Sequence, residues 1–152
     1  TPIPDDIWKQ IVEHSPLVSV DLIIEHDGGI VLGRRENKPA QGEWFIPGGV
    51  LRKGESLDEA IDRIASEELG SPVTVQTQLG VYEHRYASSE FPEVSKHYVP
   101  IAYVVTLKSD QSSLVPDTQH SSLKVFQPPF SGFHEYVQAY IDDYLEWKSE
   151  SS

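Results

Sequence analysis

The stretch GVLRKGESLDEAIDRIASEELGS, residues 49–71, decides how this chain folds. Ser56 and Glu59 have the spacing of a capping box, so a helix is expected to begin at Ser56. At about 100° per residue, one side of that helix is apolar, and its members are Leu57, Ala60, Ile61, Ile64 and Ala65. The pattern predicts a helix packed on a core, preceded by a glycine-rich turn at Gly48-Gly49.

A carboxylate interrupts this apolar side, because Glu68 falls in its middle. Burying an ionised carboxylate without a partner costs several kcal/mol, so Glu68 needs one. An arginine partner and a frayed helix end are two ordinary explanations, and a metal ion is the third. The glycine turn and the spacing to Glu55 favour the metal, and an oxygen-rich site suits Mg²⁺ or Mn²⁺.

Composition restricts the class of protein. A chain of 152 residues is expected to form a single domain spanning residues 1–152. Its formal net charge of -12 argues against nucleic acid as a partner, and no apolar run is long enough to cross a membrane. The chain has no cysteine, which fits the reducing cytoplasm, and no secretory signal is visible. We therefore expect a cytoplasmic protein.

Strands outnumber helices in the pattern along the chain. Helices are expected at residues 4–14, from residue 56 onward and at 131–147, with Phe133, Tyr136, Val137, Tyr140, Ile141, Tyr144 and Leu145 on the buried side of the last. Strands are expected at residues 17–25, 30–35, 44–47, 73–86, 97–107 and 123–127. This order predicts an α/β (α+β) fold in which a mixed β-sheet is sandwiched between α-helices.

The 49–71 stretch resembles the Nudix box, a glycine-led turn and helix that brings carboxylates to a divalent metal beside a diphosphate. The residues in register are Gly49, Glu55, Arg63, Glu67, Glu68 and Gly70. Ile64 stands where that family has the glutamate nearest the chemistry. Since isoleucine neither binds a metal nor takes a proton, one ligand or base must come from elsewhere.

The segment PDTQH, residues 116–120, is the candidate source of that group and is expected in a loop between two strands. His120 suits proton abstraction because its ordinary pKa lies near 6.5, and Gln119 offers a neutral oxygen to a hard cation. A lone loop histidine is more often an ordinary surface residue.

Beyond the box, most of the chain is similar to the GDP-mannose mannosyl hydrolase family. The similar segments are SPLVSVDLII (15–24), GRRENKPAQGEWFIPGG (33–49), KHYV (96–99) and LVPDTQH (114–120). That family also lacks the glutamate after the box arginine. It attacks sugar C1 rather than phosphorus and releases GDP and free sugar with inversion. The resemblance implies a nucleotide-sugar substrate, bound Mg²⁺ and a homodimer.

The resemblance also implies residue roles. The Gly48 carbonyl, Glu68 and Gln119 would hold the metal, and His120 would be the general base. Arg35 and Arg63 would contact the diphosphate or support its site, and Tyr98 would lie near the leaving group. Two further positions match the substrate site: Asp21 and His84.

Some roles are left open by the residues themselves. The family arginine after the Gly-Gly pair is Val50 here, so Arg52 or Lys53 becomes the candidate to contact the diphosphate. Arg63 could instead pair with Glu59 one turn away. Glu67 is either an exposed helix residue or a ligand for a second metal.

Three functions compete on this sequence. The first is hydrolysis of GDP-mannose or a related GDP-hexose at C1. The second is a Nudix pyrophosphohydrolase that cleaves the P–O–P bond of a nucleoside diphosphate sugar with Glu67 and Glu68. The third is a non-catalytic nucleotide-sugar sensor, which Val50 would allow.

Overall fold

The computed structural model describes residues 3–36, 41–108 and 120–151, with the backbone alone for residues 120–122. Its helices are α1 (Asp5–His14), α2 (Leu57–Leu69) and α3 (Glu135–Ser151). Its strands are β1 (Leu17–His26), β2 (Gly29–Arg35), β3 (Trp44–Phe45), β4 (Gly48–Val50), β5 (Val73–Val81), β6 (His84–Tyr86), β7 (Lys96–Leu107) and β8 (His120–Phe126). None of the described helices is long and apolar enough to cross a membrane.

One mixed sheet organises the fold. Its main path runs β3-β2-β1-β7-β5, while β4 pairs with β1, β6 with β7 and β8 with β2. The two central strands, β1 and β7, run parallel, and the other pairings are antiparallel. The predicted α+β fold with a mixed sheet is therefore confirmed.

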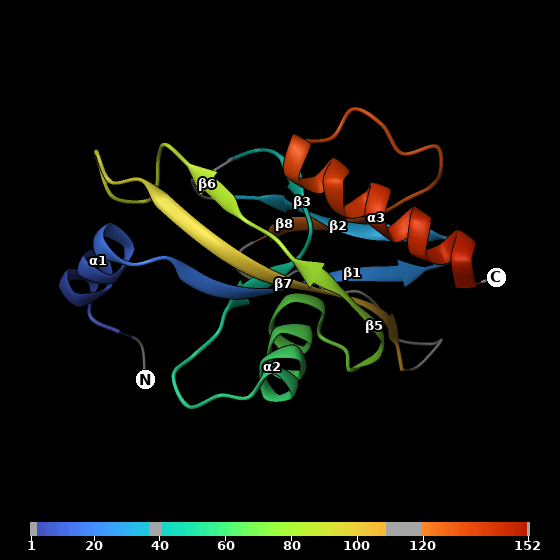
Figure 1. Cartoon of the computed structure of the whole chain (residues 1–152), viewed down its shortest axis with the longest axis horizontal. Coiled ribbons are helices and arrows are strands. Elements are labelled where there is room, and N and C mark those ends of the chain that lie inside the picture. The colour runs from blue at the N-terminus through green and yellow to red at the C-terminus, as the bar shows by residue number, and fades with distance from the viewer. Residues whose placement is uncertain (1–2, 37–40, 109–119, 152) are drawn as a thin grey trace.

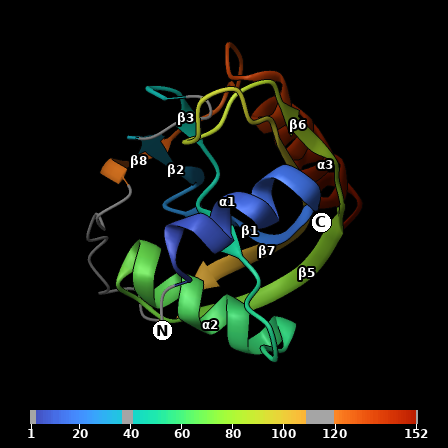
Figure 2. The same ribbon diagram turned by 90° about the vertical axis from the view of Figure 1, so that its left-hand side faces the viewer.

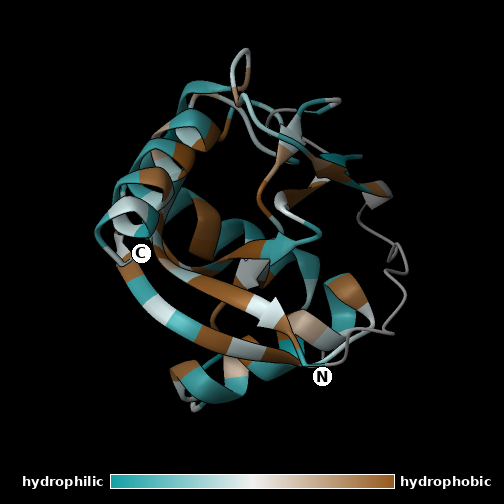
Figure 3. Ribbon diagram, turned by 90° about the vertical axis from the view of Figure 1, so that its right-hand side faces the viewer, coloured by the Kyte–Doolittle hydropathy of each residue, from teal (hydrophilic) through white to brown (hydrophobic). Residues whose placement is uncertain are grey.

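Two helices cover opposite faces of this sheet (Figure 1). Side chains alternate across each strand, so β1 sends Val20, Leu22 and Ile24 to a core shared with α2. Ile23 points to a second core, shared with α3. In Figure 3, hydrophobic segments recur among hydrophilic ones along both helices, as expected of helices with one buried side. The third helix, α1, lies at the end of the sheet where β1 begins (Figure 2).

Local signals fix both ends of α2. The Ser56 hydroxyl accepts a hydrogen bond from the Glu59 N–H, and the Glu59 carboxylate accepts one from the Ser56 N–H. Gly70 ends the helix in the left-handed conformation with φ of 67°, which glycine adopts without a Cβ clash. Glu68 is 3% exposed, so the predicted burial of this carboxylate is confirmed.

Four expectations are corrected. Residues 73–86 form two strands because Pro100 of β7, which has no N–H, interrupts the ladder between the Val81 and His84 pairings. Gly48 and Gly49 belong to strand β4 rather than to a turn. His120 opens β8, paired with Arg35, rather than lying in a loop. Leu145 is 43% exposed on α3 instead of buried.

Candidate active site

A cavity of about 700 Å³ opens beside the first half of β1, on the sheet face that carries α3. Five of the residues expected at the active site line it: Asp21, Arg35, Gly48, His84 and Tyr98. They come from five different strands, which the sheet topology brings together. The cavity is large enough for a small organic substrate.

Asp21 is a buried acidic group in the cavity wall. The Tyr140 hydroxyl, from α3, donates a hydrogen bond of 2.6 Å to its Oδ2. Burial raises the pKa of the Asp21 carboxyl to about 7, although the Tyr140 bond and the charge of Arg35 act in the opposite direction. A Cβ at Gly48 would clash with Asp21 Oδ1, so only glycine leaves room for this carboxylate.

His84 faces the same cavity as a neutral imidazole. Its ring stacks on Tyr136 of α3, with ring centres 4.1 Å apart and planes 11° from parallel. Burial lowers the pKa of His84 to about 4, and the nearby His134 contributes to the shift. At neutral pH, His84 therefore presents one donor and one acceptor nitrogen rather than a positive charge.

Arg35 and Tyr98 supply a cation and a phenol. The Arg35 guanidinium carbon lies 5.9 Å from the centre of the Phe45 ring, at the end of β2. Tyr98 lies on β7 opposite His84 and packs edge-on against Tyr86, with ring centres 6.2 Å apart. Both side chains are partly buried and line the cavity, so both are accessible to an anionic ligand there.

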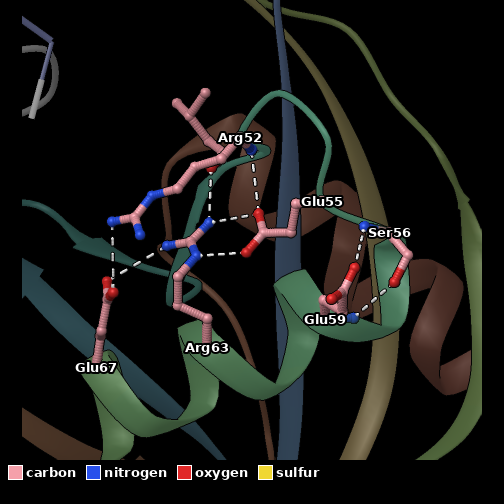
Figure 4. Close-up of polar contacts among 7 residues, drawn as sticks. Arg52, Glu55, Ser56, Glu59, Arg63 and Glu67 are labelled. Atoms are coloured by element: carbon pink, nitrogen blue, oxygen red, sulfur yellow. Dashed lines mark hydrogen bonds and ion pairs between the residues drawn. The ribbon is translucent and has the colours of Figure 1, made fainter. Parts of the chain in front are cut away.

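Arg63 lies on α2, and its side chain is hydrogen-bonded to the loop before that helix (Figure 4). It is not among the residues that line the cavity. Its Nε and Nη2 donate to the two Glu55 carboxylate oxygens at 2.7 and 3.0 Å. Nη2 also donates to the Val50 carbonyl at 2.9 Å, and Nη1 to Glu67 at 3.4 Å. This is the geometry of an arginine that supports the site by holding β4 and its loop on α2.

Glu59 and Arg52, two residues near Arg63, make other contacts than the sequence predicted. The expected alternative pairing of Arg63 with Glu59 is wrong, because Glu59 closes the capping box instead. Arg52 is exposed, lies outside the cavity lining, and pairs with Glu67 at 3.5 Å. Glu67 thus lies between two arginines at the helix surface (Figure 4).

The sheet side of α2 carries one candidate metal ligand, Glu68, and also Ile64. Ile64 is 1% exposed, and its Cγ1 lies 3.2 Å from where a Gly49 Cβ would be. Glu68 lies one turn further along the same side. The buried Glu68 carboxylate offers hard oxygen donors, which fit Mg²⁺ or Mn²⁺.

The third candidate ligand, Gln119, and the candidate general base, His120, are described in part or not at all. Gln119 lies outside the described residues, and only the backbone of His120 is described, beside Arg35. Within residues 3–36, 41–108 and 120–151, no three His, Cys, Asp or Glu side chains form a metal-binding group. The fit to a hard cation therefore rests on the kind of donors expected, which are the carboxylate of buried Glu68 and the carbonyl of Gly48.

Sequence reasoning missed the far end of the cavity. Trp8 of α1, Glu90 of the loop after β6 and Lys96 of β7 line it together. Lys96 follows a polar loop and Trp8 lies in an amphipathic helix. Neither pattern indicates a residue of a binding site. Tyr140 was assigned only to the core of α3, and its contact with Asp21 was also missed.

The mixed sheet, together with the glycine strand β4 and the helix α2 that follows it, defines a known class of protein. The model of the NUDIX domain family matches residues 15–141. The chain therefore belongs to the Nudix family of hydrolases. Accordingly it is an enzyme of a class that acts on nucleotide-derived substrates and generally uses a divalent metal.

Individual relatives cover nearly the whole chain. The low-salt glycan biosynthesis protein Agl8 of Haloferax volcanii is 54% identical over 93% of this chain and 90% of its own length. An ADP-ribose pyrophosphatase of Methanocaldococcus jannaschii is 31% identical over 95% of this chain and 82% of its own. The crystal structure of a MutT NUDIX hydrolase from Burkholderia pseudomallei superimposes with a TM-score of 0.70, at 26% identity, over 86% of this chain and 98% of that one.

Proposed function

We propose that this protein hydrolyses GDP-mannose, or a related GDP-hexose, by attack of water at sugar C1, giving GDP and free sugar with inversion. The observation that carries the proposal is Ile64. Its side chain is packed beneath Gly49 at the position where the Nudix box has a carboxylate, so this site lacks the usual group for attack at phosphorus. Breaking a C1–O bond needs a base for water and stabilisation of the departing diphosphate instead.

His120 and the residues that line the cavity would meet these two needs. His120 is the proposed general base, and its backbone lies in register with cavity-lining Arg35. Arg35 and Tyr98 would neutralise charge on the departing GDP by ionic and hydrogen-bonding contacts. Asp21 and neutral His84 would bind and orient the sugar hydroxyls at the α3 side of the cavity.

Gly48, Glu68 and Gln119 are the proposed ligands of Mg²⁺, with Mn²⁺ as the alternative ion. A bound divalent ion supplies positive charge that stabilises the diphosphate leaving group. We assign Arg63 the role of holding the loop in place, since its three nitrogens are bonded to Glu55, Glu67 and Val50. Arg52 remains the candidate for a diphosphate contact from the loop, for which it would have to leave Glu67.

A second candidate is cleavage of the P–O–P bond in a nucleotide sugar. The relative named ADP-ribose pyrophosphatase supports it, and the glutamates available for it are Glu67 and Glu68. Against it, Glu67 pairs with Arg52 and Arg63, and Ile64 leaves the third position without a carboxylate. The relative named for glycan biosynthesis supports a sugar-linked substrate under either reaction.

Product analysis tests the proposal. We expect GDP-mannose with Mg²⁺ to yield GDP, identified by phosphorus NMR, and free mannose, identified by chromatography. EDTA should abolish the activity, and added Mg²⁺ should restore it. His120→Ala should reduce turnover roughly 10²–10⁴-fold, the usual contribution of a general base. The control is His14→Ala, which removes an exposed histidine at the end of α1 and should leave turnover unchanged.

Other outcomes separate the alternatives. GMP and mannose 1-phosphate would establish the second candidate, and an active His120→Ala protein would remove His120 as the base. Metal-dependent binding of GDP-mannose without turnover would establish the sensor function. The proposed homodimer and cytoplasmic location rest on the resemblance and on composition; light scattering of the purified protein tests the former, and cell fractionation the latter.

A further inference from the structure

Aromatic rings set the plane of the His84 imidazole. Its ring stacks on that of Tyr136, with ring centres 4.1 Å apart, and lies 5.3 Å from the centre of the Tyr140 ring at a tilt of 56°. No residue in the described part of the chain forms a hydrogen bond with a ring nitrogen of His84. Because these nitrogens lie in the plane of the ring, the neighbour that fixes the plane also fixes the direction in which they meet a ligand.

The Tyr136 hydroxyl holds the strand that carries His84. The Arg85 N–H donates a hydrogen bond of 2.9 Å to the hydroxyl oxygen, and the hydroxyl donates one of 2.8 Å to the Arg85 carbonyl. Strand β6 has only three residues and, within the described ranges, pairs with β7 alone. A hydroxyl both donates and accepts, so this one side chain satisfies both backbone polar groups of Arg85 and ties β6 to α3 (Figure 2).

Tyr136 is itself fixed at the start of α3. Its backbone N–H donates to Nδ1 of His134, the residue before the helix, at 3.1 Å. This bond satisfies one of the amides that have no partner inside a helix at its first turn. The Tyr136 ring also meets Tyr86, a second residue of β6, edge-on with ring centres 5.4 Å apart. The first turn of α3, strand β6 and the plane of the His84 ring are therefore linked through one side chain.

Histidine needs such support to hold one orientation. The terminal torsion of its side chain has broad minima, so an unsupported imidazole turns easily. A ring that is held in place before the ligand arrives loses less freedom when the ligand binds. His84 lines the cavity, whereas Tyr136 packs behind His84 and is not among the lining residues. Tyr136 therefore acts on a ligand through His84 and β6 rather than by contact.

We propose that Tyr136 is a positioning residue for the substrate, which fixes the plane of the His84 imidazole and the place of β6 so that His84 meets the sugar hydroxyls in one orientation. The proposal rests on the proposed nucleotide-sugar function and adds to that site a residue behind the cavity wall. Arg35 and Tyr98, the proposed contacts of the diphosphate, lie on β2 and β7. The effect of Tyr136 is therefore confined to the sugar part of the substrate.

Proton–carbon NMR of the histidine rings tests the positioning without any substrate. A proton over the face of an aromatic ring is shielded, so the His84 ring protons should resonate upfield of those of an exposed histidine. Tyr136→Leu removes the ring and the hydroxyl and should move the His84 signals downfield. Tyr136→Phe keeps the ring, so it should produce a smaller shift. A His84→Gln sample, which lacks these signals, assigns them.

Steady-state kinetics with Mg²⁺ test the consequence for the sugar. Tyr136→Leu should lower kcat/KM for GDP-mannose about tenfold, the scale of one misplaced hydrogen bond to the substrate. The inhibition constant of GDP, which has no sugar, should change by less than about twofold. Tyr136→Phe should lower kcat/KM about threefold and also leave GDP inhibition unchanged. If the wild type binds GDP-mannose without turnover, calorimetric affinities for GDP-mannose and GDP give the same comparison.

Tyr144→Phe is the matched control. Tyr144 lies two turns further along the same side of α3, and its hydroxyl donates to the Glu25 carboxylate, outside the cavity lining. This variant also removes one hydrogen bond between α3 and the sheet, so it should lower the melting temperature. The His84 signals, kcat/KM and GDP inhibition should all remain as in the wild type.

Two results would overturn the proposal. One is a folded Tyr136→Leu protein with the His84 signals of the wild type. The other is equal weakening of GDP-mannose and GDP, which would make Tyr136 a residue of the fold alone. If Tyr136→Leu does not fold, Tyr136→Phe decides, and unchanged kcat/KM in that variant refutes the proposal. Attack at phosphorus would refute C1 hydrolysis but would leave the NMR result and the comparison of GDP-mannose with GDP valid.

Discussion

The ion pair between Arg63 and Glu55 holds the loop that precedes α2, and its contribution to the free energy of unfolding follows from the shifted pKa of Glu55. Arg63 holds the pKa of Glu55 at about 2, down from the ordinary 4.5, first through its side-chain hydrogen bonds and in part through its charge. The two side chains are 13% and 17% exposed, and the Arg52 N–H also donates to Glu55. The variant Glu55→Gln removes the charge and one of the two acceptor positions for Arg63.

A pKa lowered from 4.5 to about 2 corresponds to at most about 3–4 kcal/mol of unfolding free energy. Screening at this partly exposed site reduces the figure to about 1–2 kcal/mol. For a domain of this size, that lowers the melting temperature at pH 7 by about 2–8 °C. The stabilisation is fully present above the unfolded pKa near 4.5 and is lost as the pH falls toward 2.

Urea unfolding of the wild type and Glu55→Gln between pH 7 and pH 3 measures this difference. We expect a constant gap of about 1–2 kcal/mol above pH 5 that narrows as the pH falls below about 4.5. Glu83→Gln, at an exposed position, is the control and should show no gap. A gap that stays constant down to pH 3, or that is absent at pH 7, would refute the assignment of Arg63 and Glu55 as the pair that holds the loop.

Further predictions concern the buried surroundings of the site. Ile64→Glu should lower the free energy of unfolding by roughly 2–4 kcal/mol without metal, because it buries a carboxylate, and part of the loss should return with Mg²⁺; thermal melts with and without Mg²⁺ check this, with Ile64→Val as control. Tyr140→Phe removes the donor to Asp21 and should raise the Asp21 pKa above about 7. Carbon-13 NMR titration of the metal-free protein measures that shift, and an unchanged titration would contradict the role given to Tyr140. The same variant should lower kcat roughly tenfold, with KM little changed, if Tyr140 orients Asp21.

Local signals made much of the fold predictable from the sequence. The capping box at Ser56, the apolar stripe of α2 and Gly70 at its end all act within a few residues, so the helix follows from residues 56–70 alone. The break between β5 and β6 depends on Pro100 in another strand, a signal that the periodicity of residues 73–86 does not contain. The prediction that Leu145 is buried was wrong because Leu145 lies at the edge of the stripe formed by the buried residues of α3, and helical spacing does not show how wide the covered side of a helix is.

Some residues of the site could be predicted from sequence motifs, whereas other contacts arise only when the chain folds. The five predicted residues of the cavity came from resemblance, since nothing in their spacing indicates that five strands converge. Arg63 and Glu55 lie eight positions apart, beyond the helical spacing that predicts ion pairs, and meet because the loop folds back. Tyr140 and Asp21 are 119 positions apart, and Trp8 and Glu90 are 82 apart. Such contacts follow from the sheet topology rather than from local pattern.

The position of the bond that water breaks is the central claim, and isotope labelling measures it directly. Hydrolysis of GDP-mannose in ¹⁸O-enriched water with Mg²⁺, followed by mass spectrometry and phosphorus NMR, locates the new oxygen atom. Attack at C1 places ¹⁸O in the free mannose and leaves GDP unlabelled, which is the result that the buried Ile64 leads us to expect. Label in a phosphate of GDP, GMP or mannose 1-phosphate would mean attack at phosphorus and would contradict the account.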